Sequence, residues 1–96
     1  MPDLIIVAHV KAKPGHEAAL VAAQVELVGV VRSLPGCIAY ELHEAEGTPG
    51  EVVFYERWRD RAAWEAHMAG PHMDTFRANA GPMIGVFELF QMRQVA

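Results

Sequence analysis

His67 and His72 are the side chains of this sequence best suited to proton transfer, and a Gly-Pro break separates them. An imidazole ordinarily titrates near pH ~6.5, so it exchanges protons readily close to neutrality. Trp64 lies one helical turn before His67, and Phe76 lies one turn after His72. Each histidine therefore shares a helix face with an aromatic ring. This spacing favours a base placed beside a surface that an aromatic ligand can contact.

Two charged residues extend this candidate site. Arg77 follows in the same region and would stabilise a developing oxyanion. Glu56 is a candidate general base, although a carboxylate at a strand end beside Arg57 and Arg59 more often forms surface ion pairs.

Each candidate also has a purely structural interpretation. His67 would then cross-link helices, and His72 would satisfy free backbone groups after the break. Trp64 and Phe76, at helical spacing, would fill a core.

Three further candidates, His9, Tyr40 and His43, lie in segments that predict strands. We expect them to contribute to substrate binding if their strands line the same pocket. The chain has five histidines, but His67 and His72 are five residues apart across the break, and no H-E-x-x-H or facial-triad spacing occurs. The sequence therefore predicts no metal site.

The length and charge of the chain narrow its class. With 96 residues and 52% apolar composition, residues 1–96 predict a single domain with one small core. A net charge of −4 argues against binding to nucleic acid or to an anionic membrane surface. The N-terminus lacks the pattern of a signal peptide, and the lone Cys37 excludes an intramolecular disulfide. We expect a soluble, cytoplasmic protein.

The apolar periodicity changes several times along the chain. Residues 4–12 alternate as a strand, with an apolar face (Leu4, Ile6, Ala8, Val10, Ala12) and a mixed face (Ile5, Val7, His9, Lys11). Residues 16–33 have helical spacing, with Gln24 on the polar side. Strands are predicted over 37–44, 51–58 and 84–92, and two short helices on either side of the Gly-Pro break.

The order β-α-β-β-α-β predicts a ferredoxin-like α+β fold with a four-stranded antiparallel sheet. Both helical segments would cover one face of that sheet. The other face would expose Val, Ile, Phe and Leu to water, and apolar patches of this kind usually mark association sites. We therefore expect a homodimer in which sheet packs on sheet.

Three segments, in order over nearly the whole chain, share short motifs with one known family. They are residues 7–15 (VAHVKAKPG), 34–42 (LPGCIAYEL) and 56–60 (ERWRD), the last followed by Ala63, His67, Pro71-His72-Met73 and Phe76. Together they resemble the antibiotic biosynthesis monooxygenase domain. The resemblance implies a dimeric α+β barrel with a pocket between helices and sheet in each subunit.

Members similar to this chain are described as quinol monooxygenase-like. The resemblance implies oxidation of a small aromatic, phenolic or quinol substrate by O2, without metal, haem or flavin. Haem-degrading relatives carry an Asn on the first strand and an axial His near the second helix. This chain has His9 and Phe76 in those regions, and its one asparagine is Asn79, which counts against haem.

Two alternatives remain open at this point. One is an isomerase of a small polar metabolite, in which the histidines would shuttle a proton and Arg77 would hold an anionic group. The other is a non-catalytic dimeric module that binds a ligand. Fold similarity alone does not choose between these activities.

Overall fold

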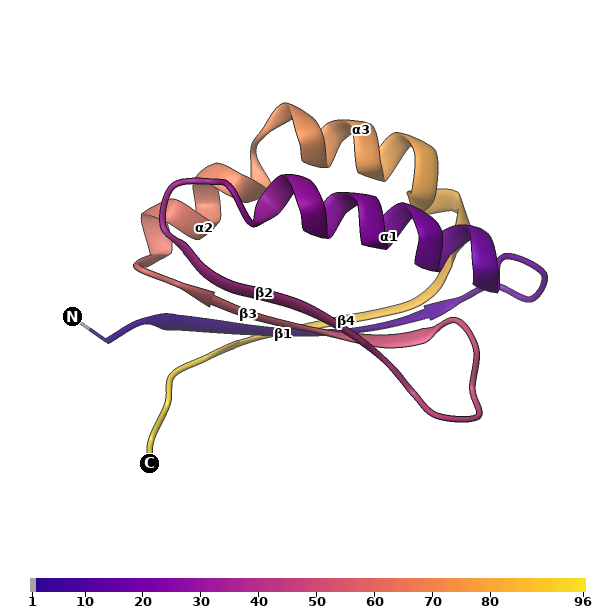
Figure 1. The fold of residues 1–96 in the computed structure, drawn as a ribbon, viewed down its shortest axis with the longest axis horizontal. Helices are drawn as coiled ribbons and strands as arrows, with labels where there is room; N and C mark the ends of the chain where they lie inside the picture. Colours follow the sequence, from indigo (N-terminus) through magenta and orange to yellow (C-terminus); the bar gives the residue numbers. More distant parts are fainter. Residues whose placement is uncertain (1) are drawn as a thin grey trace.

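The structure is a computed structural model that describes residues 2–96, and its elements follow the predicted order (Figure 1). The bounds are β1 Leu4–Ala12, α1 Glu17–Val31, β2 Cys37–Glu44, β3 Glu51–Trp58, α2 Arg61–Met68, α3 Pro71–Ala80, the 3-10 turn η1 Gly81–Met83 and β4 Ile84–Met92. Among these described residues, no helix is both long enough and apolar enough to cross a bilayer.

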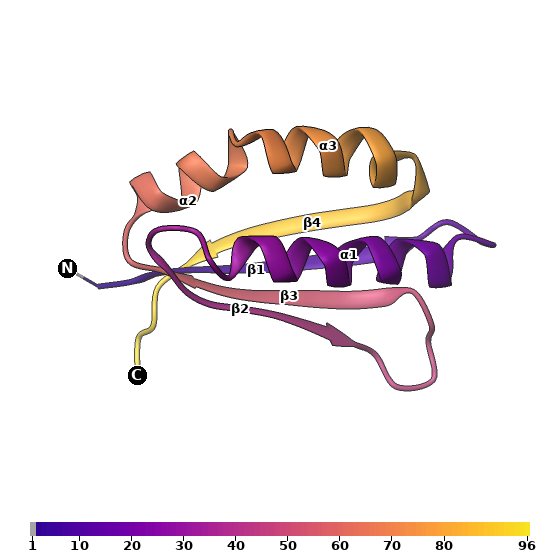
Figure 2. The same ribbon diagram turned by 45° about the horizontal axis from the view of Figure 1, so that its top comes forward.

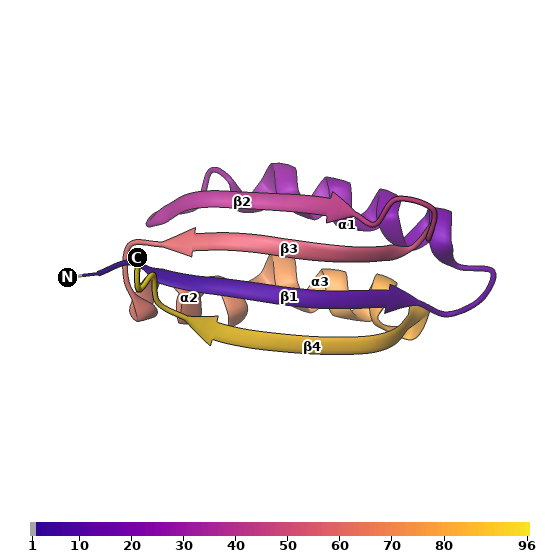
Figure 3. The ribbon, with the colours of Figure 1, turned by 90° about the horizontal axis from the view of Figure 1, so that it is seen from below.

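The four strands form one antiparallel sheet in the order β2-β3-β1-β4. All three helices lie on one face of it, with α1 over the β2 side and α3 over the β4 side (Figure 2). Viewed from the other face, the strands lie in front and no helix covers them (Figure 3). The ferredoxin-like α+β prediction is therefore confirmed.

The alternation predicted for β1 is confirmed: Ile6, Ala8, Val10 and Ala12 are buried beneath the helices. The strand predicted over 84–92 is confirmed as β4, and its pairing with β1 contains one irregularity. The pairing between β1 and β4 shifts between Lys11 and Ala12, so that Ala12 lies opposite Ile84. This irregularity turns Ile84 toward the helices, on the side of the sheet that also carries Leu89, which pairs with Ala8.

The helix α1 packs on the sheet through Leu20, Leu27 and Val31, as its spacing predicts. Gln24 corrects the prediction, because it is 1% exposed and not on the solvent side. It is four residues after Leu20 and three before Leu27, so helical geometry places it on their face.

Short-range contacts fix α2 beside the sheet. The Asp60 carboxylate accepts a hydrogen bond from the Ala63 N–H at 2.8 Å and so caps the helix. Gly36 has φ +80° and lies so close to α2 that a Cβ there would be 2.5 Å from the Cβ of Ala63. Gly70 ends this segment, and Pro71 begins α3 at the first helical position, where a missing N–H costs least.

Candidate functional site

The imidazole of His67 lies at the centre of an aromatic cluster between α2 and the sheet. His67 is 3% exposed. Its ring is nearly parallel to that of Trp58, with centroids 4.9 Å apart and an angle of 17°. Tyr40 approaches the same imidazole edge-on at 5.7 Å. Stacking on Trp58 and the edge-on contact with Tyr40 therefore hold the His67 ring in one orientation.

His67 is hydrogen-bonded to His72 across the break between α2 and α3. Nδ1 of His67 lies 2.8 Å from Nε2 of His72. The ring centroids are 5.0 Å apart and the planes differ by 20°, so the rings lie edge to edge in nearly one plane. One nitrogen of the contact must donate and the other accept. When His67 donates through Nδ1, its Nε2 carries a free lone pair.

The pKa of His67 is lowered to about 4, first by burial and then by the neighbouring His72 and Arg77. The imidazole is therefore neutral throughout the physiological pH range. A neutral imidazole can accept a proton, whereas a protonated one cannot.

A small cavity of about 50 Å³ lies between the helices and the sheet. Three predicted site residues, Tyr40, His67 and Phe76, line it, and Glu56 and Gln24 line it as well. The other lining residues are apolar and come from both layers: Ala8, Val10, Leu27, Phe54, Met68, Met73, Ile84, Phe87 and Leu89. The cavity is thus apolar with a few polar groups.

Glu56 is 5% exposed and lines the cavity between the helices and the sheet. Its carboxylate accepts a hydrogen bond from Nε1 of Trp58 at 2.9 Å. Burial raises the pKa of Glu56 to about 7, against the opposing effect of the Trp58 bond. The expected surface ion pairs are not formed, since Arg57 pairs with Asp3 and Arg59 with the aspartate that follows it.

Gln24 contributes an amide whose two polar ends are both unsatisfied. Its Nε2 and Oε1 are buried and have no hydrogen-bond partner among residues 2–96. A buried amide left in this state costs about 1–3 kcal/mol for each unsatisfied group. Such a group calls for a partner that occupies the cavity.

An open groove of about 520 Å³ lies on the outer side of the histidine pair. His67 and His72 both line it, together with Pro35, Arg59 and Ala63. His67 thus borders the cavity on one side and the groove on the other. A cavity that takes benzene measures roughly 150 Å³, so the inner cavity is closed to an aromatic ring in this conformation.

The remaining predicted site residues lie elsewhere. Arg77 is half-exposed and donates to the Met68 carbonyl at 2.9 Å, so it closes the end of α2 and does not line the cavity. Trp64 is buried but is not among the cavity residues. His9 and His43 lie on the sheet face that no helix covers.

His9 bridges two carboxylates on that open face. Its Nε2 is 2.8 Å from Glu51 and its Nδ1 is 3.1 Å from Glu88. These two contacts raise the pKa of His9, first through Glu51 and then through Glu88. His43 contacts Glu41 at 2.9 Å and is exposed. Neither histidine can reach the cavity through the sheet.

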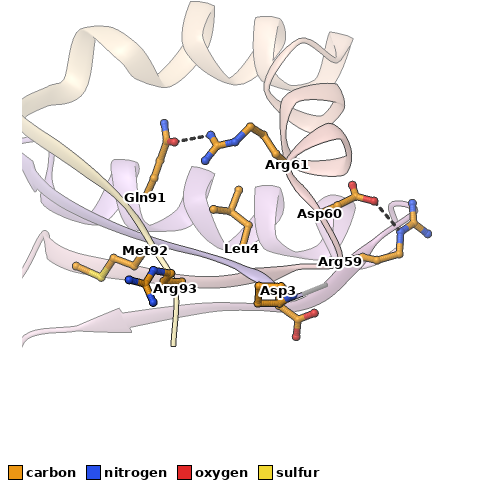
Figure 4. A pocket seen from close by; sticks show the side chains of 9 residues that line it. Asp3, Leu4, Arg59, Asp60, Arg61, Gln91, Met92 and Arg93 are labelled. Atoms are coloured by element: carbon orange, nitrogen blue, oxygen red, sulfur yellow. Dashed lines mark hydrogen bonds and ion pairs between the residues drawn. The ribbon is translucent and has the colours of Figure 1, made fainter. Parts of the chain in front are cut away.

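A third hollow, of about 620 Å³, lies where the end of β4 meets the turn between β3 and α2 (Figure 4). Arg59, Arg61 and Arg93 line it, and Arg61 donates to Gln91. Asp60 accepts from Arg59 at 3.4 Å. Among residues 2–96, no three His, Cys, Asp or Glu side chains gather closely enough to hold a metal ion.

Sequence reasoning missed Gln24 and undervalued Glu56. The signal for Gln24 was its position between Leu20 and Leu27 on one helix face. The signal for Glu56 was the strand alternation, which places it on the same face as Phe54 and Trp58. In both cases a polar side chain lies in a buried layer, where its polarity alone predicts exposure.

Comparisons with known proteins agree with this architecture. The chain is 34% identical over 80 residues to "Putative monooxygenase Rv0793" of Mycobacterium tuberculosis, covering 82% of this chain and 77% of that protein. It is 32% identical over 73 residues to "Uncharacterized protein sll1783" of Synechocystis, covering 76% of this chain and 50% of the relative, so it spans about half the length of that protein.

The solved structure of PA3566 from Pseudomonas aeruginosa superposes with a TM-score of 0.94 at 29% identity, over 100% of this chain and 97% of that one. SO0527 from Shewanella oneidensis gives a TM-score of 0.89 at 29% identity, over 97% and 91% of the two chains. The sequence pattern described as antibiotic biosynthesis monooxygenase matches residues 3–79. The chain therefore belongs to the antibiotic biosynthesis monooxygenase family.

Proposed function

We propose that this protein is a cofactor-free monooxygenase that oxidises an electron-rich phenol or quinol with dioxygen. The observation that carries the proposal is the buried, neutral His67 in the cavity wall, hydrogen-bonded at Nδ1 to His72. A phenol becomes a good reductant only after it loses its proton. His67 would accept that proton at Nε2, and its Nδ1 proton would pass to His72 beside the outer groove.

The proposed reaction balances without an external reductant. Loss of an O–H proton to His67 gives a quinolate, which passes one electron to dioxygen. The semiquinone and superoxide then join through a carbon–oxygen bond, and the peroxide takes up a proton. Loss of the ring C–H proton breaks the O–O bond, leaving a carbonyl on the ring and releasing water. The quinol has lost four electrons, and each product holds one oxygen atom of dioxygen.

The substrate must open the cavity before it can react there. Met68, Met73 and Phe76 line the cavity on its helical side. Methionine is unbranched and changes rotamer easily, so Met68 and Met73 can yield to a planar ring. After closure, the apolar wall would exclude water from the reacting oxygen atoms.

The isomerase alternative lacks the cationic residue that it requires in the cavity. An anionic metabolite needs a cationic partner, and Arg77 lies outside the cavity. The second candidate is instead a non-catalytic ligand-binding module, which the small volume of the cavity favours. The two remaining candidates differ in whether oxygen is consumed.

Oxygen uptake with a simple quinol, such as the reduced form of a naphthoquinone, tests the proposal. We expect one O2 consumed for each hydroxyquinone formed, with label from 18O2 in the product. His67→Phe should lower this turnover by about 10²-fold or more. Turnover that continues unchanged without oxygen, or that yields peroxide and an unlabelled quinone, would overturn the proposal. Ligand affinity that survives loss of both histidines without any oxygen uptake would identify the binding module.

We also infer that the protein forms a homodimer through the open face of its sheet. Val53, Val86, Phe90 and Met92 are exposed on this face. Large apolar side chains gathered on one face are unusual for a monomer. A second copy would cover them and provide the burial that a chain of 96 residues gains with difficulty from its own core.

A further inference from the structure

We propose that Gln24 selects the substrate, and that it favours an aromatic ring with two adjacent oxygen atoms, as in a catechol or an ortho-hydroxy carbonyl compound. The inference rests on the proposed function in one respect, because it takes the cavity beside His67 as the place where the ring binds. It goes further by naming the substrate class and the residue that recognises it.

The amide of Gln24 is buried in the layer between α1 and the sheet. The residue is 1% exposed on α1, between Leu20 and Leu27, which are themselves buried. It lines the same cavity as His67. Neither Nε2 nor Oε1 has a partner within residues 2–96. An amide placed in an apolar layer without partners is destabilising, so its presence there points to a ligand that satisfies it.

The two unsatisfied ends define what that ligand must offer. Nε2 needs an acceptor and Oε1 needs a donor, and the two atoms lie side by side on one amide. A ring with adjacent oxygens presents a hydroxyl donor and a neighbouring acceptor along one edge. A 1,4-quinol presents only one oxygen to the amide and leaves the other end unpaired. Sites built to pair polar groups discriminate strongly against ligands that leave them unpaired.

Glu56 strengthens this interpretation from the sheet side of the cavity. Its carboxyl group is buried and has one partner, the indole N–H of Trp58 at 2.9 Å. Its remaining oxygen can accept from a second substrate hydroxyl. Gln24 from the helical layer and Glu56 from the sheet thus supply the polar contacts in a cavity that is otherwise largely apolar.

Binding of catechol and of hydroquinone, measured by calorimetry without oxygen, tests the inference. These probes have the same atoms and differ only in the placement of the second hydroxyl. We expect wild type to bind catechol at least ~10-fold more tightly, the equivalent of one net hydrogen bond. Gln24→Met keeps the length of the side chain and should abolish the preference. Val25→Met, which introduces the same side chain at an exposed position of α1, should retain it.

The outcomes separate this inference from the proposed function. Equal affinities in wild type, no catechol binding, or a preference that survives in Gln24→Met would each overturn the role of Gln24. Because no oxygen is present, a protein that fails as an oxygenase would still show the catechol preference if Gln24 selects the ligand. Thermal unfolding of both variants checks that they are folded, and Gln24→Leu, which also removes both polar atoms of the amide, provides a second variant that should lose the preference.

Discussion

Nδ1 of His67 and Nε2 of His72 lie 2.8 Å apart in nearly coplanar rings, one buried and the other beside an open groove. The contact links the cavity, which His67 lines, to the open groove, which both histidines line. A proton accepted on the cavity side of His67 can leave on the groove side of His72 without any movement of His67 itself. This linkage compensates for the low pKa of His67, because a buried imidazolium would be unstable unless its charge moved outward.

Replacing His72 by Phe should slow turnover while leaving the quinol KM nearly unchanged. Phe retains an aromatic ring but removes the acceptor for the Nδ1 proton of His67. We expect kcat to fall by about 10–10²-fold. Steady-state kinetics across pH 5–9 measure the change, and added imidazole should restore part of the rate. A variant with wild-type kcat at every pH would show that His72 only packs against its neighbour.

Gly70→Ala tests the same contact without removing either histidine. A Cβ at this position would lie 2.5 Å from Cε1 and 2.7 Å from Nδ1 of His72, so the imidazole must move. We expect a smaller loss of kcat than for His72→Phe, in the same direction. Gly29→Ala is the matched control, since nothing lies within 4 Å of its added methyl. That change should stabilise the fold by about 0.5–1 kcal/mol and leave kcat unaltered.

The sheet was predictable because strand alternation and the faces of β1 follow directly from the sequence. The break between His67 and His72 was predictable because Gly-Pro ends one helix and starts another. The burial of Gln24 and Glu56 was predictable only from helical spacing and strand alternation, because the polarity of both side chains indicates exposure. That these two side chains, one on α1 and one on β3, face the same cavity depends on tertiary packing, which no local pattern encodes. The same limit applies to His9, whose carboxylate partners come from two neighbouring strands.

Glu56→Gln should stabilise the protein increasingly as the pH rises from 4.5 to 7. The pKa of Glu56 is about 7 in the folded state and near 4.5 when exposed, so the folded protein holds its proton more tightly. The stability that this proton provides is complete below pH 4.5 and is lost as the pH rises through 7. The difference amounts to about 3 kcal/mol. Gln still accepts the Trp58 N–H, and urea unfolding at several pH values measures the effect. A constant difference between variant and wild type would contradict it.

His67→Phe should remove a pH dependence of the protein's stability that is opposite in sign to the one caused by Glu56. The pKa of His67 is about 4 in the folded state against 6.5 when exposed, so the unfolded chain binds the extra proton. The resulting contribution to stability is complete above pH 6.5 and is lost as the pH falls toward 4. Wild type should therefore show a nearly flat stability between pH 4.5 and 6.5, where Glu56 and His67 oppose each other. In His67→Phe, the same denaturation series should show stability rising steadily as the solution is acidified through this window.

Phe90→Asp should convert the proposed dimer into a monomer. Phe90 pairs with Val7 on the sheet face that no helix covers, and it is 45% exposed in the single chain. A carboxylate there would have to lose its hydration in a sheet-to-sheet interface, which is strongly unfavourable. Sedimentation velocity at micromolar concentration measures the shift. Val25→Asp is the matched control, because Val25 is 57% exposed on α1, away from this face. If both variants sediment as wild type does, the open sheet face is not the interface; if wild type itself sediments as a folded single chain, the homodimer is refuted.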